Sequence, residues 1–323
     1  MNQNIDQNSQ VGSDTNRKRL ANHRTYGGGW AAGPWVTLIF GFIFIGVGTA
    51  VILLAMGIIP SSEENFNAPK GLVGIIGGIF AVAGVSIVLG GVNGVSKKAK
   101  LRNKALQHPD QPWLADYNWS EAGSRDDTLR QVTKMFMGAI FISVFMVPFN
   151  WLIFFSDESV PFFVHIIISI FDLAALAAWG YAVYLLGRWL KYRDSRIIFD
   201  TFPFFLGQML SVRWSPSRAL GNYNKITFIL RCVEEVKETT GTGKNRQTQI
   251  VSYQIWADQF VVDEPGRHEG LYDVPVTFLL PADGRPTKIN APLAQYWEIE
   301  IHADTPGIDF KADYMVPVYA PVR

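Results

Sequence analysis

Three polar residues that could carry a proton lie within one long apolar segment, 161–187. His165, Ser169 and Asp172 are spaced by four and then three residues, so a helix places them on one face. Burial in a medium of low dielectric constant favours the protonated form of a carboxyl group, which could then donate a hydrogen bond. One hypothesis is therefore a proton or ion relay in which His165 communicates with Asp172, through Ser169, across two helical turns.

The alternative is a structural role for the same polar face, which Leu176 and Trp179 extend at the same spacing. An acid near the centre of a bilayer costs at least ~2.5 kcal/mol on insertion scales and normally faces protein or a wet cavity. Asp172 could lock two helices together by a hydrogen bond to Asn150 in the preceding apolar segment. One acid and one histidine are few for a transporter, and the sequence lacks a pair of interrupted helices, so we favour this structural hypothesis.

Membrane helices would position these residues, and the composition supports such helices. The chain of 323 residues is 48% hydrophobic and contains 22 Phe and 10 Trp, which is unusually apolar for a soluble protein. A hydrocarbon core about 30 Å thick requires roughly 20 apolar residues of helix. Four segments meet this length and carry almost no charge: 34–59, 71–95, 133–155 and 161–187.

Basic residues gather at three places along the chain, although the formal net charge is only +1. They precede the first apolar segment, follow the second and follow the fourth: Arg17, Lys18, Arg19 and Arg24; Lys97, Lys98, Lys100, Arg102 and Lys104; Arg188, Lys191, Arg193 and Arg196. The two remaining connections, 61–70 and 156–159, are short and acidic. Because positively charged connections stay in the cytoplasm, we expect a multi-pass protein of the bacterial inner membrane with both termini cytoplasmic.

The hydrophobic pattern changes to strict alternation in the C-terminal part of the chain. Trp297, Ile299 and Ile301, for example, alternate with Glu298 and Glu300. A period of two predicts half-buried strands, which we place at 203–214, 225–236, 247–257, 258–263, 273–280, 295–303 and 308–319. Because no helical segment of useful length interrupts them, they predict an antiparallel β-sandwich.

These patterns divide the chain into three parts. We expect a disordered basic N-terminal tail over 1–24 and a four-helix transmembrane domain over 25–194 with a cytoplasmic loop at 96–131. A cytoplasmic β-sandwich domain would follow over 195–323, which is long enough for a core of its own. The predicted fold class is therefore membrane α-helical with four spans, plus an all-β C-terminal domain.

Two glycine pairs with four-residue spacing lie in the second apolar segment. They are Gly74 with Gly78 and Gly90 with Gly94. Small residues let membrane helices approach closely, where van der Waals contacts drive their association. The pairs indicate either a homo-oligomer interface or packing between the first two spans, and we favour the packing of the two spans.

Motifs for catalysis or cofactor binding are weak in this sequence. The stretch TGTGKNRQT (240–248) departs from a phosphate-binding loop, because Glu238 and Asn245 stand where that motif has Gly and Ser or Thr. The five histidines are scattered, and the only cysteine, Cys232, lies on the apolar face of its predicted strand. We therefore expect no enzymatic activity, no metal, no cofactor and no nucleic-acid partner.

An aromatic-rich stretch, HPDQPWLADYNW (108–119), lies between the second and third apolar segments. Its two prolines stop the preceding helix. Trp113, Tyr117 and Trp119 could then lie at the level of the lipid headgroups, as interfacial aromatic residues do. We predict that this interface loop anchors the connection either to lipid or to the C-terminal domain.

The same stretch resembles a signature of the bacterial membrane proteins of the domain of unknown function 3592 family, through Pro109, Pro112, Trp113, Leu114 and Trp119. Ala115 and Asn118 depart from that signature, which has an aromatic residue and an acid there. The run YWEIEIHADTPGIDFKADYMVPVY (296–319) is similar to the closing pattern of the family. With FLLP (278–281), this end of the chain also resembles an arrestin-type β-sandwich. The resemblance covers 97–323 and implies an integral membrane protein with a cytoplasmic β-sandwich, but no activity and no site residues.

From these patterns we expect a non-enzymatic protein whose partners are the lipid bilayer and a protein bound by the cytoplasmic domain. The β-sandwich would then act as a membrane-tethered interaction or scaffolding module. The alternative function is a transporter or channel component that uses the polar face of the fourth apolar segment, with His165, Ser169 and Asp172.

Overall fold

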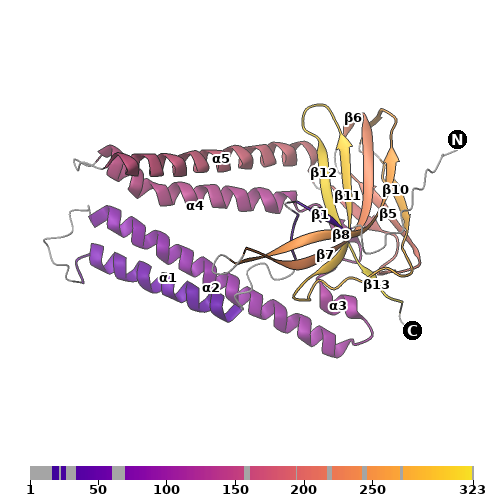
Figure 1. Ribbon diagram of the computed structural model, residues 1–323, viewed down its shortest axis with the longest axis horizontal. Helices are drawn as coiled ribbons and strands as arrows, with labels where there is room; N and C mark the ends of the chain where they lie inside the picture. The colour runs from indigo at the N-terminus through magenta and orange to yellow at the C-terminus, as the bar shows by residue number, and fades with distance from the viewer. Residues whose placement is uncertain are drawn as a thin grey trace. The chain divides into compact units, whose positions relative to one another are not determined.

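The computed structural model describes residues 17–21, 23–26, 34–59, 70–155, 161–193, 195–216, 220–241, 246–269 and 272–321 (Figure 1). The chain divides into two compact units. One, here named the helical unit, combines Ala31–Lys100 with Arg130–Leu186. The other, here named the β unit, combines Met1–Trp30, Leu101–Leu129 and Gly187–Arg323. The units therefore interleave along the sequence.

Four long helices carry the apolar segments. They are α1 (Pro34–Ala55), α2 (Lys70–Gln107), α4 (Thr128–Phe155) and α5 (Phe162–Tyr192). All four are long and apolar enough to cross a membrane, with mean hydropathies from 1.8 to 2.7. Only 11% to 22% of the most apolar window of each helix is buried in the structure, so these helices expose apolar surface on most sides. The first helix ends at Ala55 rather than at the predicted residue 59, because the chain turns at Gly57, whose φ is 72°.

Glycines bring α1 and α2 together, but not the glycines that the four-residue spacing selected. Gly48 packs so tightly that an added Cβ would lie 2.6 Å from the carbonyl oxygen of Gly77. Gly84 is equally close to α1, where an added Cβ would lie 2.7 Å from the carbonyl oxygen of Gly41. The contacting glycines are seven residues apart on each helix, as expected for helices that pack at a small crossing angle.

The predicted glycine pairs contribute little to this contact. A Cβ at Gly74 would meet only Ala55, at 3.8 Å, and a Cβ at Gly78, Gly90 or Gly94 would meet no atom within 4 Å among the described residues. Packing between the first two apolar helices is therefore confirmed, whereas the glycines chosen for it were wrong. Helical period alone does not say which face of α2 meets α1.

The β unit contains two larger sheets, both antiparallel. The five-stranded sheet has the order β1-β8-β7-β11-β12 and is built from Lys18–Leu20, Gln247–Val262, Lys225–Thr240, Gln295–Asp304 and Phe310–Val316. The four-stranded sheet has the order β10-β5-β3-β2 and is built from Val274–Leu279, Met209–Ser215, Arg196–Phe199 and Gly123–Arg125. Two small sheets pair β13 (Val318–Tyr319) with β4 (Phe204–Phe205) and β6 (Gly221–Tyr223) with β9 (Gly266–His268). A short helix, α3 (Pro112–Asp116), completes the unit.

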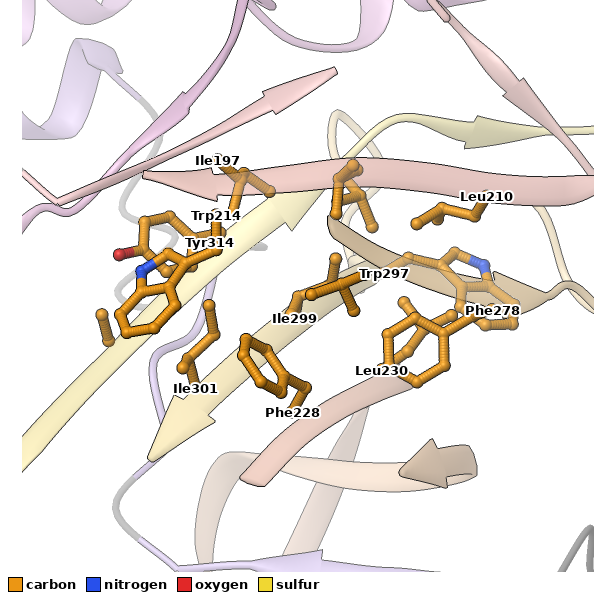
Figure 2. Packing of buried hydrophobic residues seen from close by; sticks show 14 of the residues in the cluster. Ile197, Leu210, Trp214, Phe228, Leu230, Phe278, Trp297, Ile299, Ile301 and Tyr314 are labelled. Carbon is orange, nitrogen blue, oxygen red and sulfur yellow. The ribbon is translucent and has the colours of Figure 1, made fainter. Parts of the chain in front are cut away.

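One hydrophobic core joins the buried faces of the two larger sheets. Figure 2 shows Trp214 and Leu210 of β5 packed near Phe228 of β7 and Trp297 of β11. Trp214 and Phe228 meet edge to face, with ring centroids 5.7 Å apart. Large aromatic side chains of this kind typically each contribute about 3–5 kcal/mol to stability when truncation is measured. The alternation seen in the sequence therefore identifies the core-facing residues of these strands correctly.

Two of the predicted strands are in fact one. The segments 247–257 and 258–263 form the continuous strand β8, which pairs with β7 along its length. The register shifts between Cys232 and Val233, opposite Trp256 and Gln254, so Ile255 is an extra residue. Such a β-bulge reverses the phase of the alternation within a strand.

The N-terminal segment corrects the prediction of a disordered tail over 1–24. Lys18–Leu20 form strand β1, which pairs antiparallel with Ser252–Gln254 of β8. Residues 1–16 lie outside the described residues. The composition of the segment is polar, and its order comes from hydrogen bonds to a strand that lies more than 200 residues away in sequence.

Candidate functional site

The predicted interface loop packs on strands of the β unit. Trp113, in α3, meets the ring of Phe205 edge on, with centroids 6.2 Å apart, and lies 5.9 Å from Tyr319. Tyr117 and Trp119 lie against each other at 4.8 Å. The structure therefore brings all three predicted aromatic residues to the C-terminal strands, which is one of the two anchors that the sequence suggested.

A short chain of hydrogen bonds holds this loop in place. The indole nitrogen of Trp119 donates to the hydroxyl of Tyr319 at 3.0 Å, and that hydroxyl donates to the carboxylate of Asp116 at 3.1 Å. Asp116 also accepts from the backbone N–H of Asn290 at 2.8 Å. Burial raises the pKa of Tyr319, as does the nearby Asp116 carboxylate, so the phenol stays protonated and available as a donor. The prediction that this loop lies at the level of the lipid headgroups stays a prediction.

The N-terminal segment covers the same side of the β unit. Tyr26 meets Tyr296 edge on at 4.7 Å, and the hydroxyl of Tyr296 donates to the carbonyl of Arg24 at 2.8 Å. Together with the loop, the segment closes a second hydrophobic cluster around Val233, Ile289, Ala294, Tyr296 and Met315, against which Leu20, Tyr26, Tyr117 and Trp119 pack. The apolar residues of the segment are too sparse in the sequence to predict this role.

A buried ion network lies on the five-stranded sheet, and it is the strongest candidate for chemistry in the β unit. Arg231 of β7 donates to Glu298 of β11 at 2.5 Å and also contacts Glu300 at 2.6 Å and Asp313 at 3.6 Å. The ring of His23 lies 3.0 Å from Glu298. The alternation in the sequence predicts that these glutamates lie on the outer face of their strand, but His23 covers Glu298 on that face.

The surroundings of this network shift the pKa values of its carboxyl groups in opposite directions. Burial raises the pKa of Glu298, but His23 and Arg231 outweigh that effect and hold it below its ordinary value. Burial, together with Glu298 and Glu300, raises the pKa of Asp313 to about 6. Carboxyl groups with separated pKa values suit acid–base chemistry where a substrate can reach them. Glu298 is only 2% exposed, so in this conformation the network holds strands together.

The intramembrane candidates lie between α4 and α5 of the helical unit. The amide nitrogen of Asn150 donates to Asp172 at 2.9 Å, and the indole nitrogen of Trp179 donates to the hydroxyl of Ser143 at 3.0 Å. Asn150 and Ser143 are seven residues apart, as are Asp172 and Trp179, so two polar pairs repeat along the contact. The matched spacing was the sequence signal that could have identified Ser143.

His165 and Ser169 do not join these pairs. The Nδ1 atom of His165 lies 3.4 Å from the carbonyl oxygen of Pro161, one turn back in its own helix, and Ser169 is exposed. Leu176, which shares their predicted face, is 69% exposed. Of the four residues predicted to form an intramembrane site, the structure therefore joins only Asn150 and Asp172.

Other candidate chemistry does not assemble within the described part of the chain. No group of three or more His, Cys, Asp or Glu side chains is placed there to hold a metal ion. Cys232 is buried in the core, where burial raises the pKa of its thiol and disfavours the reactive thiolate. The glycine-rich stretch 240–248 connects β7 to β8, and residues 242–245 of it lie outside the described ranges.

Comparison with known proteins adds a weak likeness to a solved structure. No family model and no curated protein matches the chain. Among solved structures, it is similar to Spo0M, the sporulation control protein from Bacillus subtilis, with 17% sequence identity and a TM-score of 0.22. The similarity covers 39% of this chain and 48% of that chain, so it spans about half the length of that structure. A likeness of this size assigns neither a fold family nor an activity.

Proposed function

We propose that the chain is a membrane-anchored interaction module, in which four spans hold a cytoplasmic β-sandwich that docks a protein partner. One observation carries the proposal. The β unit is assembled from three segments, and each adjoins the end of an apolar helix: Met1–Trp30, Leu101–Leu129 and Gly187–Arg323. A domain that is connected to membrane helices at three points is suited to holding a binding surface beside a membrane.

Strand pairing between these segments supports the proposed topology. β1 of the first segment pairs with β8 of the third, and β2 of the second pairs with β3 of the third. Strands that pair with each other must lie on the same side of a bilayer. An open sheet cannot cross the hydrocarbon core, because the backbone groups at its edges would be unpaired there. If all four helices cross the membrane, these three segments would lie on one side of it, and their basic residues favour the cytoplasm of a bacterial cell.

The finer fold and family assignments are part of the same proposal. Two antiparallel sheets whose buried faces contribute to one core are consistent with a β-sandwich. The aromatic loop and the run 296–319, which carry the resemblance to the domain of unknown function 3592 family, lie in that β unit. We propose membership in that family on those residues.

The edge strand β10 of the four-stranded sheet is the surface that we favour for binding a partner. Among the described strands, β10 pairs on one side only, with β5. Leu279 and Met209 face each other across these strands and are 58% and 56% exposed. An extended segment of a partner could add a strand there, with Leu279 and Met209 giving apolar contacts. Pro275 lacks an N–H group, so pairing would use Val276–Leu279.

Site-specific photo-crosslinking in intact cells tests this proposal. A photoreactive amino acid at position 279 should give one adduct of discrete mass with a protein partner, and Met209→Lys should abolish that adduct. The matched control carries the same amino acid at Thr239, which is exposed on β7. Equal adducts from both positions, or none from position 279 in a protein that is folded and membrane-bound, would contradict the docking of a partner at this edge.

A further inference from the structure

A small surface hollow lies within the β unit, where α5 ends. It is formed by the last turn of α5, the residues that open α4 and the start of β12. Its lining includes Asp126, Thr128, Arg188, Trp189, Arg193 and Lys311. Lys311 also pairs with Glu300 of the Arg231 network, whereas Arg188 belongs neither to that network nor to the polar pairs of the helical unit.

Positive charge dominates the hollow. Arg188, Arg193 and Lys311 supply three cations, against the single carboxylate of Asp126. Asp126 is already engaged, because it accepts hydrogen bonds from the backbone N–H and the hydroxyl of Thr128, at 3.1 Å and 2.6 Å. Half-buried Arg188 attracts the nearby Asp126 carboxylate, but it makes no ion pair within 4.0 Å among the residues that the structure describes. A guanidinium in this position has donors available for an incoming anion.

Neighbouring contacts hold the cations in place. The guanidinium of Arg193 lies over the ring of Trp189, 5.0 Å from its centroid. Between them in the sequence, Lys191 donates to the carbonyl oxygens of Pro306 and Ile308 at 2.9 Å and 2.8 Å, which ties the last turn of α5 to the connection between β11 and β12. Preorganisation of this kind lowers the entropy lost when a ligand binds.

We propose that this hollow binds a phosphate group, with Arg188 and Arg193 as its principal donors. The planar guanidinium matches the geometry of phosphate oxygens and donates paired, charge-assisted hydrogen bonds to them. Lys311 adds a point charge at the rim, where it also pairs with Glu300 at 3.3 Å. The inference rests on the proposed membrane placement for the source of the ligand, which is the headgroup of an anionic phospholipid.

Two features favour a lipid as that source. Arg188 is the first charged residue after the apolar stretch of α5, which is where a span reaches the phosphate layer of a bilayer. Leu129 and Leu190, each one residue from a lining residue of the hollow, are 47% and 42% exposed. Exposed leucines at that level could contact the acyl chains of a lipid whose phosphate occupies the hollow.

Native mass spectrometry of the full-length protein in detergent tests the site. The wild type should retain phosphatidylglycerol in preference to phosphatidylcholine, and Arg188→Gln with Arg193→Gln should lower that preference roughly tenfold or more. The matched control, Lys100→Gln with Arg102→Gln, removes two cations from α2 and should retain the wild-type preference. Equal losses in both double variants would overturn the site, since general attraction to basic residues would then explain the binding. An unchanged preference in the first variant would overturn it as well.

Competition separates the two sources of the phosphate group. If the ligand is a lipid, short-chain phosphatidylglycerol should displace the bound lipid while inorganic phosphate at the same concentration does not. Displacement by inorganic phosphate, lost in Arg188→Gln with Arg193→Gln, would support the site with free phosphate as its ligand. Folding of each variant is checked by its thermal unfolding.

Alkaline extraction of membranes distinguishes the phosphate site from the proposed function. A chain that is extracted contradicts the membrane-anchored module, whereas an inserted chain without a lipid preference contradicts only the phosphate site.

Discussion

The helical unit and the β unit are stabilised by opposite arrangements of the same residue types. In the helical unit the large apolar side chains face outward, and close contact is made by glycines and two polar pairs. In the β unit the aromatic residues form the core, and charged residues are mostly exposed apart from the Arg231 network. The proposed membrane placement accounts for this difference, because apolar side chains gain little by clustering in lipid.

The comparison implies different sensitivities to substitution. Loss of a charge partner should be most costly in the β unit, where ions are buried in a protein interior. Added bulk should be most costly in the helical unit, where backbones touch directly at Gly48 and Gly84. The following predictions test that contrast, beginning with the largest effect.

Substitution of Arg231 should have the largest effect on the β unit. Arg231→Met leaves buried Glu298 with His23 but without its guanidinium partner, which should lower the free energy of unfolding by about 3–5 kcal/mol. Chemical denaturation in detergent, followed by tryptophan fluorescence, measures the change. Arg267→Met is the matched control, because its ion pair with Glu269 is exposed and should contribute about 0–1 kcal/mol. Similar losses from both substitutions would remove the contrast between buried and exposed ions.

Added bulk at Gly48 should have the next largest effect, in the helical unit. Gly48→Ala forces α1 away from α2, and overpacking of this kind typically costs about 1–3 kcal/mol. Loss of helical signal on titration with sodium dodecyl sulfate measures it. Gly90→Ala, on α2 but with open space around its Cβ position, should leave the titration unchanged. A greater loss from Gly90→Ala than from Gly48→Ala would mean that the predicted glycine pairs make the important contact after all.

The pair Asn150–Asp172 should contribute a smaller amount. A double-mutant cycle with Asn150→Ala and Asp172→Ala should give a coupling energy of about 0.6 kcal/mol, typical of hydrogen bonds between membrane helices. The same titration with sodium dodecyl sulfate measures each variant. Asp172→Asn provides the functional control, since the relay hypothesis expects it to abolish an ion or proton flux while the protein remains abundant. Such a result would favour the transporter alternative over the structural role.

The smallest predicted effect concerns Asp313 and pH. Its pKa is raised from an ordinary value of 3.8 to about 6, so between these values the folded state binds more protons than the unfolded state. The free energy of unfolding should therefore fall as pH rises from about 4 to about 6, by an amount that solvent screening keeps small. Denaturation at a series of pH values should show this fall in the wild type but not in Asp313→Asn.

Glu298 changes the free energy of unfolding with pH in the opposite direction to Asp313. Its folded pKa lies below the ordinary value of 4.5, so its contribution is present above pH 4.5 and is lost on further acidification. A stability that rises through pH 4 to 6 in the wild type would contradict the direction assigned to Asp313.

Local pattern accounts for much of the fold but less of the candidate sites. Uniform apolarity identified α1, α2, α4 and α5, and alternation identified β7, β11 and β12 with their core-facing residues. The Asn150–Asp172 bond was among the hypotheses because both residues are rare in apolar segments. Alternation also marked Glu298 as outward-facing, but it could not show that His23, from a segment 275 residues earlier, would cover it.

By itself, the sequence determined the four long helices and the apolar faces of β7, β11 and β12, because hydrophobic periodicity is a property of neighbouring residues. Tertiary structure alone decided that Lys18–Leu20 joins β8, that Gly48 rather than Gly90 touches a neighbouring helix, and that Arg188 and Arg193 line one hollow with Lys311. These outcomes depend on partners far apart along the chain. A periodic pattern states that a face must be covered, whereas packing in three dimensions determines what covers it.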